Sequence, residues 1–141
     1  MSGFLLDTNI ISELIKPKPE PRLVTWLSGT DETLLYLSVL TLGEIRKGIE
    51  ALKQPARRVQ LETWLDSELR LRFSGRILTV DDDVADRWGV IVGRAAARKI
   101  ALPVIDGLLA ATALHYNLTL VTRNSKDVVG TEVSVFNPWE S

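Results

Sequence analysis

The amino-acid sequence predicts an α/β fold with a short, mostly parallel central sheet flanked by helices. Short segments rich in Leu, Ile and Val alternate with segments whose apolar residues recur at helical spacing. Strands that alternate with helices in this way pair in parallel and are covered on both faces, which produces a layered domain. No linker-like stretch interrupts the alternation, so we expect residues 1–141 to form a single domain.

The first elements are bounded by prolines. Residues 3–6 (GFLL) predict a buried strand, and a helix over 10–15 follows it. This helix must end at the run KPKPEP, because proline lacks the N–H group that a helix interior needs. A short helix over 22–27 and a strand over 33–37 come next.

Capping residues and periodicity mark the central elements. Ser38 is a suitable N-cap for a helix over 39–53, and a second helix begins after Pro55 and carries apolar residues up to Leu69. The triplet Asp81–Asp83 can cap a further helix. The remaining predicted elements are a strand over 76–80, helices over 84–95 and 108–116, and strands over 118–122 and 133–136.

Composition limits the chemistry that the chain can perform. The net charge of −1 indicates no global basic field of the kind that nucleic-acid-binding domains often carry. The absence of Cys excludes thiolate chemistry, and the single histidine, His115, excludes a multi-histidine zinc site. Catalysis would have to use carboxylates, hydroxyls and amides, which favour an oxygen-bound ion such as Mg²⁺ or Mn²⁺.

The start of the sequence and its hydropathy predict a cytoplasmic protein. The first residues contain no basic segment followed by an apolar core, so we expect no signal peptide. No apolar run approaches the roughly 20 residues that span a bilayer.

Polar residues follow the predicted strands at positions that converge on one edge of the sheet. Asp7 comes directly after the first strand, Thr122 ends the strand over 118–122, and Asp106 precedes the helix that leads into that strand. Ligands of open parallel sheets bind beyond the carboxyl ends of the strands. Each aspartate taken alone is also a common helix N-cap, and that simpler interpretation stays open.

Four ordered segments resemble a known family. They are LLDTNIISELIKP, LSVLTLGEIRKGI, PVIDGLLAATALHYNLTLVTRNSKD and VSVFNPW, and they cover nearly the whole chain. Together they resemble the PIN-domain toxins of the VapC type, and most closely the FitB-like branch. The resemblance implies a PIN-like three-layer fold and a metal-dependent endoribonuclease that is the toxin of a type II toxin–antitoxin pair.

The resemblance also implies a set of site residues. Asp7, Glu44 and Asp106 match the acidic positions of the family, and Asn124 falls on the fourth, where many relatives carry Asp. Asp127 is the alternative for that fourth position. We expect Asp7 and Asp106 to bind the first Mg²⁺ or Mn²⁺ ion, with Glu44 binding a second ion or positioning water.

Periodicity alone gives a different interpretation of Glu44. It lies off the apolar stripe of its helix, which is typical of a solvent-exposed glutamate. We expect Thr8 and Thr122 to orient the metal ligands by hydrogen bonding.

Several basic and aromatic residues are candidates for RNA contacts. Arg123 is the best placed of the basic residues, because it lies next to the predicted site; the others are Arg46, Lys47, Arg94, Arg98, Lys99 and Lys126. Trp64 and Trp88 fall on apolar stripes and are expected in the core, and His115 is expected to be structural rather than catalytic.

Parts of the sequence suggest two other functions. The acidic run RILTVDDDVADRW is similar to the metal-binding start of a phosphate-accepting receiver domain, but too little chain follows it to complete that fold. The stronger alternative is a catalytically weak binding module that regulates transcription in complex with a DNA-binding antitoxin. The resemblance implies an antitoxin partner and a homodimer or toxin–antitoxin hetero-oligomer, besides the RNA substrate.

Overall fold

A five-stranded parallel sheet forms the centre of the computed structural model, which describes residues 3–140. The strands are β1 (Phe4–Leu6), β2 (Leu35–Ser38), β3 (Ile77–Leu78), β4 (Thr119–Val121) and β5 (Val135–Phe136). Their order across the sheet is β3-β2-β1-β4-β5, so β1 is central and has a parallel neighbour on each side. The mostly parallel sheet predicted from the sequence is confirmed.

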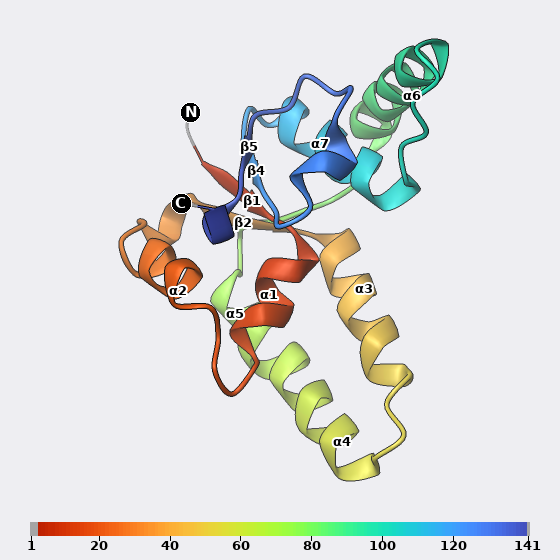
Figure 1. Cartoon of the computed structure of the whole chain (residues 1–141). Helices are drawn as coiled ribbons and strands as arrows, with labels where there is room; N and C mark the ends of the chain where they lie inside the picture. The colour runs from red at the N-terminus through yellow and green to blue at the C-terminus, as the bar shows by residue number, and fades with distance from the viewer. Residues whose placement is uncertain (1–2, 141) are drawn as a thin grey trace.

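Seven α-helices occur within residues 3–140 and lie around the sheet or against the helices that cover it (Figure 1). They are α1 (Thr8–Leu14), α2 (Pro21–Ser28), α3 (Val39–Glu50), α4 (Pro55–Thr63), α5 (Arg70–Arg72), α6 (Asp82–Ala97) and α7 (Val104–His115). Between α4 and α5 the chain forms a π-helical segment, Trp64–Leu69, so helical backbone runs unbroken from residue 55 to 72. Short 3₁₀ turns occupy Glu32–Leu34, Ser125–Val128 and Pro138–Glu140.

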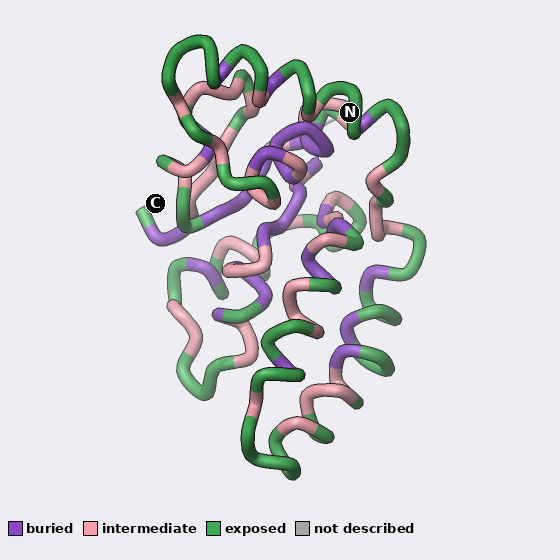
Figure 2. Tube along the Cα trace, turned by 90° about the vertical axis from the view of Figure 1, so that its right-hand side faces the viewer, coloured by how far each residue is buried: buried purple, intermediate pink, exposed green. Residues whose placement is uncertain are grey.

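Alternating side chains of β1 enter two different cores, which defines the layers. Leu6 packs on one face of the sheet with Ile10 of α1, Leu42 of α3 and Leu65 of the π-helical segment. Leu5 packs on the other face against α7, whose Leu109, Ala110 and Ala113 are fully buried. Figure 2 shows that burial is concentrated in the strands and α7, while the outer faces of the surrounding helices are exposed.

Helix α6 lies outside α7 and does not join either sheet-facing core. Val84 and Ile91 of α6 pack against Ala111 of α7, with Trp88 partly buried beside them. Gly107 permits this close approach, because a Cβ added there would lie 3.1 Å from the indole Nε1 of Trp88. Trp64 and Trp88 therefore contribute to apolar packing as expected, although both are only partly buried.

Two predicted helices begin earlier than the sequence pattern indicates. Helix α1 starts at Thr8 rather than residue 10, and α7 starts at Val104 rather than 108. Asp106 therefore lies inside the first turn of α7 instead of preceding the helix, and the N-cap of α7 is Pro103. The Asp triplet does cap α6, where Asp81 accepts a hydrogen bond from the Val84 N–H.

The helical segments show no membrane-spanning character. None of the helices between residues 3 and 140 is both long enough and apolar enough to cross a bilayer.

Candidate active site

Asp7 lies at the carboxyl end of the central strand, where its carboxylate is almost completely buried. Only 7% of the residue is exposed, and its backbone N–H donates to the Val121 carbonyl of β4 at 2.9 Å. The side chain caps α1, with Oδ1 accepting from the Thr8 N–H at 2.6 Å. The cap interpretation is thus correct for Asp7, but it accounts for only one of the two carboxylate oxygens.

The second oxygen of Asp7 is held by side chains that converge from two elements. Oδ2 accepts a hydrogen bond from the Thr122 hydroxyl at 2.8 Å and a longer one from the Asn9 amide at 3.3 Å. Thr122 is 1% exposed and follows β4, so the predicted orienting role of this residue is matched by a direct contact. Burial raises the pKa of Asp7 above its usual range, and these hydrogen bonds offset the effect in part.

Glu44 enters the same site from α3. The Thr8 hydroxyl donates to Glu44 Oε1 at 2.5 Å, and the residue is half-buried. The solvent-exposed glutamate indicated by periodicity is therefore wrong, because the first turn of α1 packs beside α3 and covers this part of the helix surface. The start of α1 thus connects two carboxylates, one through its backbone and one through its hydroxyl.

Asp106 completes the acidic wall from the first turn of α7. It is half-buried, and no hydrogen bond or ion pair to its carboxylate occurs within the part of the chain that the structure describes. Burial raises its pKa to about 6, and the negative charges of Asp7, Asp127 and Glu44 add to the shift. A cation placed among these carboxylates would stabilise the charged form of Asp106.

The residues after β4 form the floor of the site. The Asn124 N–H donates to the Thr122 hydroxyl at 3.0 Å, and the Asn124 side chain is exposed at the pocket. Asp127 does not line this pocket, although its charge raises the pKa of both Asp7 and Asp106. Asn124 is therefore next to the predicted ligands, and Asp127 acts on them at longer range.

Asn9 is a site residue that the sequence reasoning missed. Its amide donates to Asp7 and to Thr122, at 3.2 Å in the latter case, and its carbonyl oxygen accepts from the Arg123 N–H. It therefore joins the first turn of α1 to the loop after β4. The signal was present in the LDTN run, where the Asn side chain follows Asp7 by two residues.

The four predicted site residues line one pocket of about 380 Å³. Asp7, Glu44, Asp106 and Asn124 are joined there by the basic residues Lys16 and Arg123. Of the other basic candidates, Arg46 is paired with Asp66 at 2.6 Å and Arg98 donates to the Gly130 carbonyl. Arg123 is thus the candidate that borders the acidic residues.

Oxygen donors of this kind suit a hard divalent cation. Mg²⁺ is typically held by one or two carboxylates and completes its shell with water or phosphate oxygens, which an open pocket can admit. Burial is the main cause of the raised pKa of Asp7 and of Asp106, and the neighbouring carboxylates add to both shifts, so a bound cation would stabilise the charged forms. The residues present therefore fit the kind of ion that the resemblance implies.

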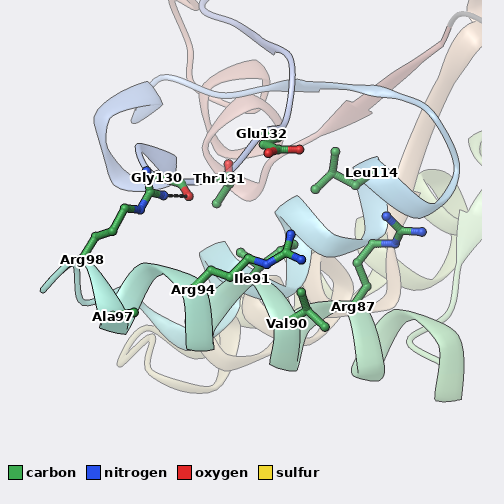
Figure 3. Close-up of a pocket in the computed structure, with 10 residues that line it drawn as sticks. All are labelled: Arg87, Val90, Ile91, Arg94, Ala97, Arg98, Leu114, Gly130, Thr131 and Glu132. Carbon is green, nitrogen blue, oxygen red and sulfur yellow. Dashed lines mark hydrogen bonds between the residues drawn. The ribbon is translucent and has the colours of Figure 1, made fainter.

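A larger pocket lies elsewhere, between α6 and the loop after Ser125–Val128 (Figure 3). It has a volume of about 580 Å³ and is lined by Arg87, Arg94 and Arg98 with Val90, Ile91 and Leu114. Near one end of α6, ligand atoms of Asp81, Asp83 and His115 lie within 4.8 Å of one another. Both aspartates are exposed, and Asp81 Oδ1 accepts a hydrogen bond from the Val84 N–H as the N-cap of α6. Helix capping therefore accounts for the position of Asp81 without a metal ion.

Comparison with known proteins shows which family the chain is similar to. A family model described as PIN domain matches residues 4–127. The chain is 37% identical over 135 residues to Toxin FitB of Neisseria gonorrhoeae, covering 96% of this chain and 97% of that protein. It is 31% identical over 136 residues to VapC ribonuclease Y4jK of Sinorhizobium fredii, covering 96% and 97% of the two chains.

Solved structures give the same result. The crystal structure of FitAcB from Neisseria gonorrhoeae has a TM-score of 0.93 at 36% identity, covering 98% of this chain and 99% of that chain. The structure of FitAB bound to an IR36 DNA fragment has a TM-score of 0.91 at 35% identity, covering 96% and 95%. The fold class predicted from the sequence, including the family resemblance, is confirmed.

The raised pKa of Asp106 predicts a pH-dependent gain in stability for Asp106→Asn in metal-free buffer. Because the folded protein holds this proton up to about pH 6 and the unfolded chain releases it near 3.8, ionisation of Asp106 lowers the free energy of unfolding as pH rises through this window. After allowance for solvent screening, ionised Asp106 lowers the free energy of unfolding above pH 7 by about 1 kcal/mol, which corresponds to about 2–4 °C in Tm.

Thermal unfolding at pH 7.5 and pH 4 in EDTA tests this expectation. Asp106→Asn should raise Tm at pH 7.5 and have little effect at pH 4, whereas Glu132→Gln, which changes an exposed residue outside the pocket, should leave Tm unchanged at both. A lower Tm for Asp106→Asn at pH 7.5 would contradict the electrostatic account.

Proposed function

Since the chain belongs to the PIN-domain family, we propose that it is the toxin of a toxin–antitoxin pair and a divalent-metal-dependent endoribonuclease. It would act in the cytoplasm and hydrolyse RNA phosphodiester bonds. The observation that carries the proposal is the convergence of Asp7, Glu44 and Asp106 from three separate elements on one pocket. Carboxylates placed close together repel one another, which is unfavourable unless a cation lies between them. Hydrolysis of RNA by a bound cation is a function that requires such an arrangement.

Asp7 and Asp106 would hold the first ion, Mg²⁺ or Mn²⁺, with Glu44 as ligand of a second ion or as the residue that orients water. A bound divalent cation stabilises charge on phosphate oxygens and makes a coordinated water more acidic. Asn124 would contribute a neutral oxygen or an N–H donor, since its side chain is exposed at the pocket.

The surrounding side chains hold the carboxylates in place. Thr122, Asn9 and the Thr8 N–H fix both oxygens of Asp7, so the carboxylate cannot rotate away when the substrate binds. The Thr8 hydroxyl does the same for Glu44. No hydrogen bond from the described residues 3–140 restrains Asp106 in this way, which leaves its oxygens free to adapt to a ligand.

A protein antitoxin would bind on the opposite side of the sheet from α7. A pocket of about 520 Å³ lies there between the end of α1 and α4 and includes Ile15, Leu61 and Trp64. Its apolar residues and open shape suit an amphipathic helical segment of a partner. In the related structures, FitAB is bound to DNA, which supports the alternative that this chain acts mainly within a DNA-binding complex.

A second copy of the chain is the partner we propose for α6. Its exposed residues Asp82, Asp86, Val90, Arg94 and Arg98 follow one another at intervals of four and change from acidic to basic about a central valine. Two such ridges packed antiparallel about a two-fold axis at Val90 would pair Asp86 with Arg94 and Asp82 with Arg98 of the other copy. Within residues 3–140, Asp86 and Arg94 form no ion pair, so both are available for this contact.

Cleavage assays should show metal-dependent hydrolysis that requires Asp7. Purified antitoxin-free protein should cut total or transfer RNA with Mg²⁺ or Mn²⁺ and not in EDTA, and Asp7→Asn should reduce the rate by about a hundredfold or more. Glu132→Gln, prepared in the same way, controls for contaminating nucleases. Equal cutting by wild type and Asp7→Asn, or none by either, would favour the binding-module alternative.

Charge exchange on α6 tests the proposed homodimer. Asp86→Arg or Arg94→Glu alone should place like charges opposite each other and weaken self-association about tenfold in sedimentation equilibrium. The double variant Asp86→Arg/Arg94→Glu should restore association by reversing both charges. Unchanged association in the single variants, or no rescue in the double variant, would show that α6 is not the contact.

A further inference from the structure

Two basic residues of the carboxylate pocket are not explained by metal binding. Lys16 and Arg123 line the same pocket as Asp7, Glu44 and Asp106, together with the buried Glu13. An acidic wall suits a cation, whereas these two basic residues suit an anion in the same pocket. The pocket is therefore built for a ligand that combines a metal-binding group with a further negative charge.

The position of Arg123 is fixed by contacts that leave its guanidinium group available. Its N–H donates to Asn9 Oδ1 at 3.2 Å, and its carbonyl accepts from the Asn137 amide at 3.1 Å. The guanidinium carbon lies 5.2 Å from the ring centroid of Trp139, which is 9% exposed. Asn137 in turn accepts from the Trp139 N–H at 2.9 Å.

No hydrogen bond or ion pair within residues 3–140 engages the guanidinium of Arg123, although one face of it is stacked. Stacking orients the planar group before any ligand binds, and its N–H edges remain free. A planar fork of donors of this kind matches the oxygens of a phosphate.

Glu13 holds the second basic residue at the pocket. Its Oε1 accepts from the Lys16 ammonium at 2.8 Å and its Oε2 from the Glu20 N–H at 2.9 Å. Glu13 is 7% exposed, whereas 56% of the Lys16 side chain is exposed. An ammonium has three donors, so this contact leaves two for a ligand.

Both oxygens of Glu13 are already engaged, which separates it from the metal-binding carboxylates. The hydrogen bond from Lys16 is the main reason that the pKa of Glu13 lies below its usual value, and the Glu20 N–H and the charges of Lys16 and Arg123 lower it further. Removing its charge would release Lys16 from the pocket and leave the backbone N–H of Glu20 with a weaker acceptor.

We propose that Lys16 and Arg123 form a second phosphate subsite, which binds the phosphate adjacent to the scissile one, and that Glu13 is its positioning residue. This inference rests on the proposed ribonuclease function and specifies its substrate class. The preferred substrate is an oligonucleotide with at least two consecutive phosphates, since a dinucleoside monophosphate could occupy only the acidic side of the pocket.

Binding measured without cleavage provides the first test. A labelled single-stranded oligonucleotide is titrated with protein in EDTA at several salt concentrations. Because each phosphate neutralised in a single strand contributes about 0.7 to the slope of log K against log salt, Lys16→Gln/Arg123→Gln should reduce that slope by about 0.7. It should also weaken binding about tenfold at low salt.

Matched variants separate this subsite from general loss of positive charge. Lys18→Gln and Lys53→Gln remove two exposed charges from positions that do not line the pocket. Their double variant should keep the wild-type slope. Equal slopes of log K against log salt for the wild type and Lys16→Gln/Arg123→Gln would overturn the proposal. An equally large reduction of the slope in the control double variant would also overturn it.

Kinetics with two substrates provide the second test. Lys16→Gln/Arg123→Gln should raise KM for a trinucleoside diphosphate about tenfold with little change in kcat, and leave a dinucleoside monophosphate unaffected. Glu13→Gln should raise KM for the trinucleoside diphosphate by a smaller factor than the double variant does. It should cause no further rise in KM when Lys16→Gln is already present, whereas a purely structural role of Glu13 would raise KM in both backgrounds. Equal losses on both substrates would refute the subsite.

The two tests also separate the subsite from the nuclease activity. If Lys16→Gln/Arg123→Gln changes the salt dependence of binding but neither it nor the wild type cleaves RNA, the anion-binding site is supported and the ribonuclease proposal is contradicted. The opposite result is also possible: RNA cleavage requires Asp7, and Lys16→Gln/Arg123→Gln binds RNA with the salt dependence of the wild type. That result would support the ribonuclease proposal and overturn the phosphate subsite.

Discussion

The burial of one carboxylate at the end of the central strand is the constraint on which the site depends. Asp7 is 7% exposed and lies where β1, β4 and α1 meet. Burial of a charge is unfavourable unless hydrogen bonds compensate it, and here each oxygen is engaged by a neighbouring element. The strand order that makes β1 central therefore also determines which side chains can reach Asp7.

The contacts around Asp7 extend into a network that reaches both sides of the pocket. Thr8 connects Asp7 to Glu44 of α3, and Asn9 connects it to Thr122 and to the backbone of Arg123. Three consecutive residues of one turn thus set the relative positions of acidic and basic groups. Acidic residues and the basic residues Lys16 and Arg123 line the same pocket.

Sequence reasoning predicted the layered α/β fold because short apolar runs and helical periodicity are local properties. It placed the starts of α1 and α7 too late, since Thr8 and Asp106 are polar and were assigned to loops rather than first turns. Glu44 could be selected only through the family resemblance, because periodicity does not reveal that α1 covers that face of α3. The strand order and the proximity of Glu13, Lys16 and Arg123 arise from long-range packing that a single sequence does not encode locally.

The uneven distribution of the pocket residues along the chain has an evolutionary consequence. Between residues 45 and 105, a stretch that contains the projecting end of α3, the helical run over 55–72 and all of α6, no residue lines the carboxylate pocket (Figure 1). Substitutions at the exposed positions of this stretch would change the outer surface and leave the lining of the pocket unchanged. Duplicated copies of such a gene could therefore diverge in the proteins they recognise, and so avoid cross-talk within one cell, while each retains the same chemistry.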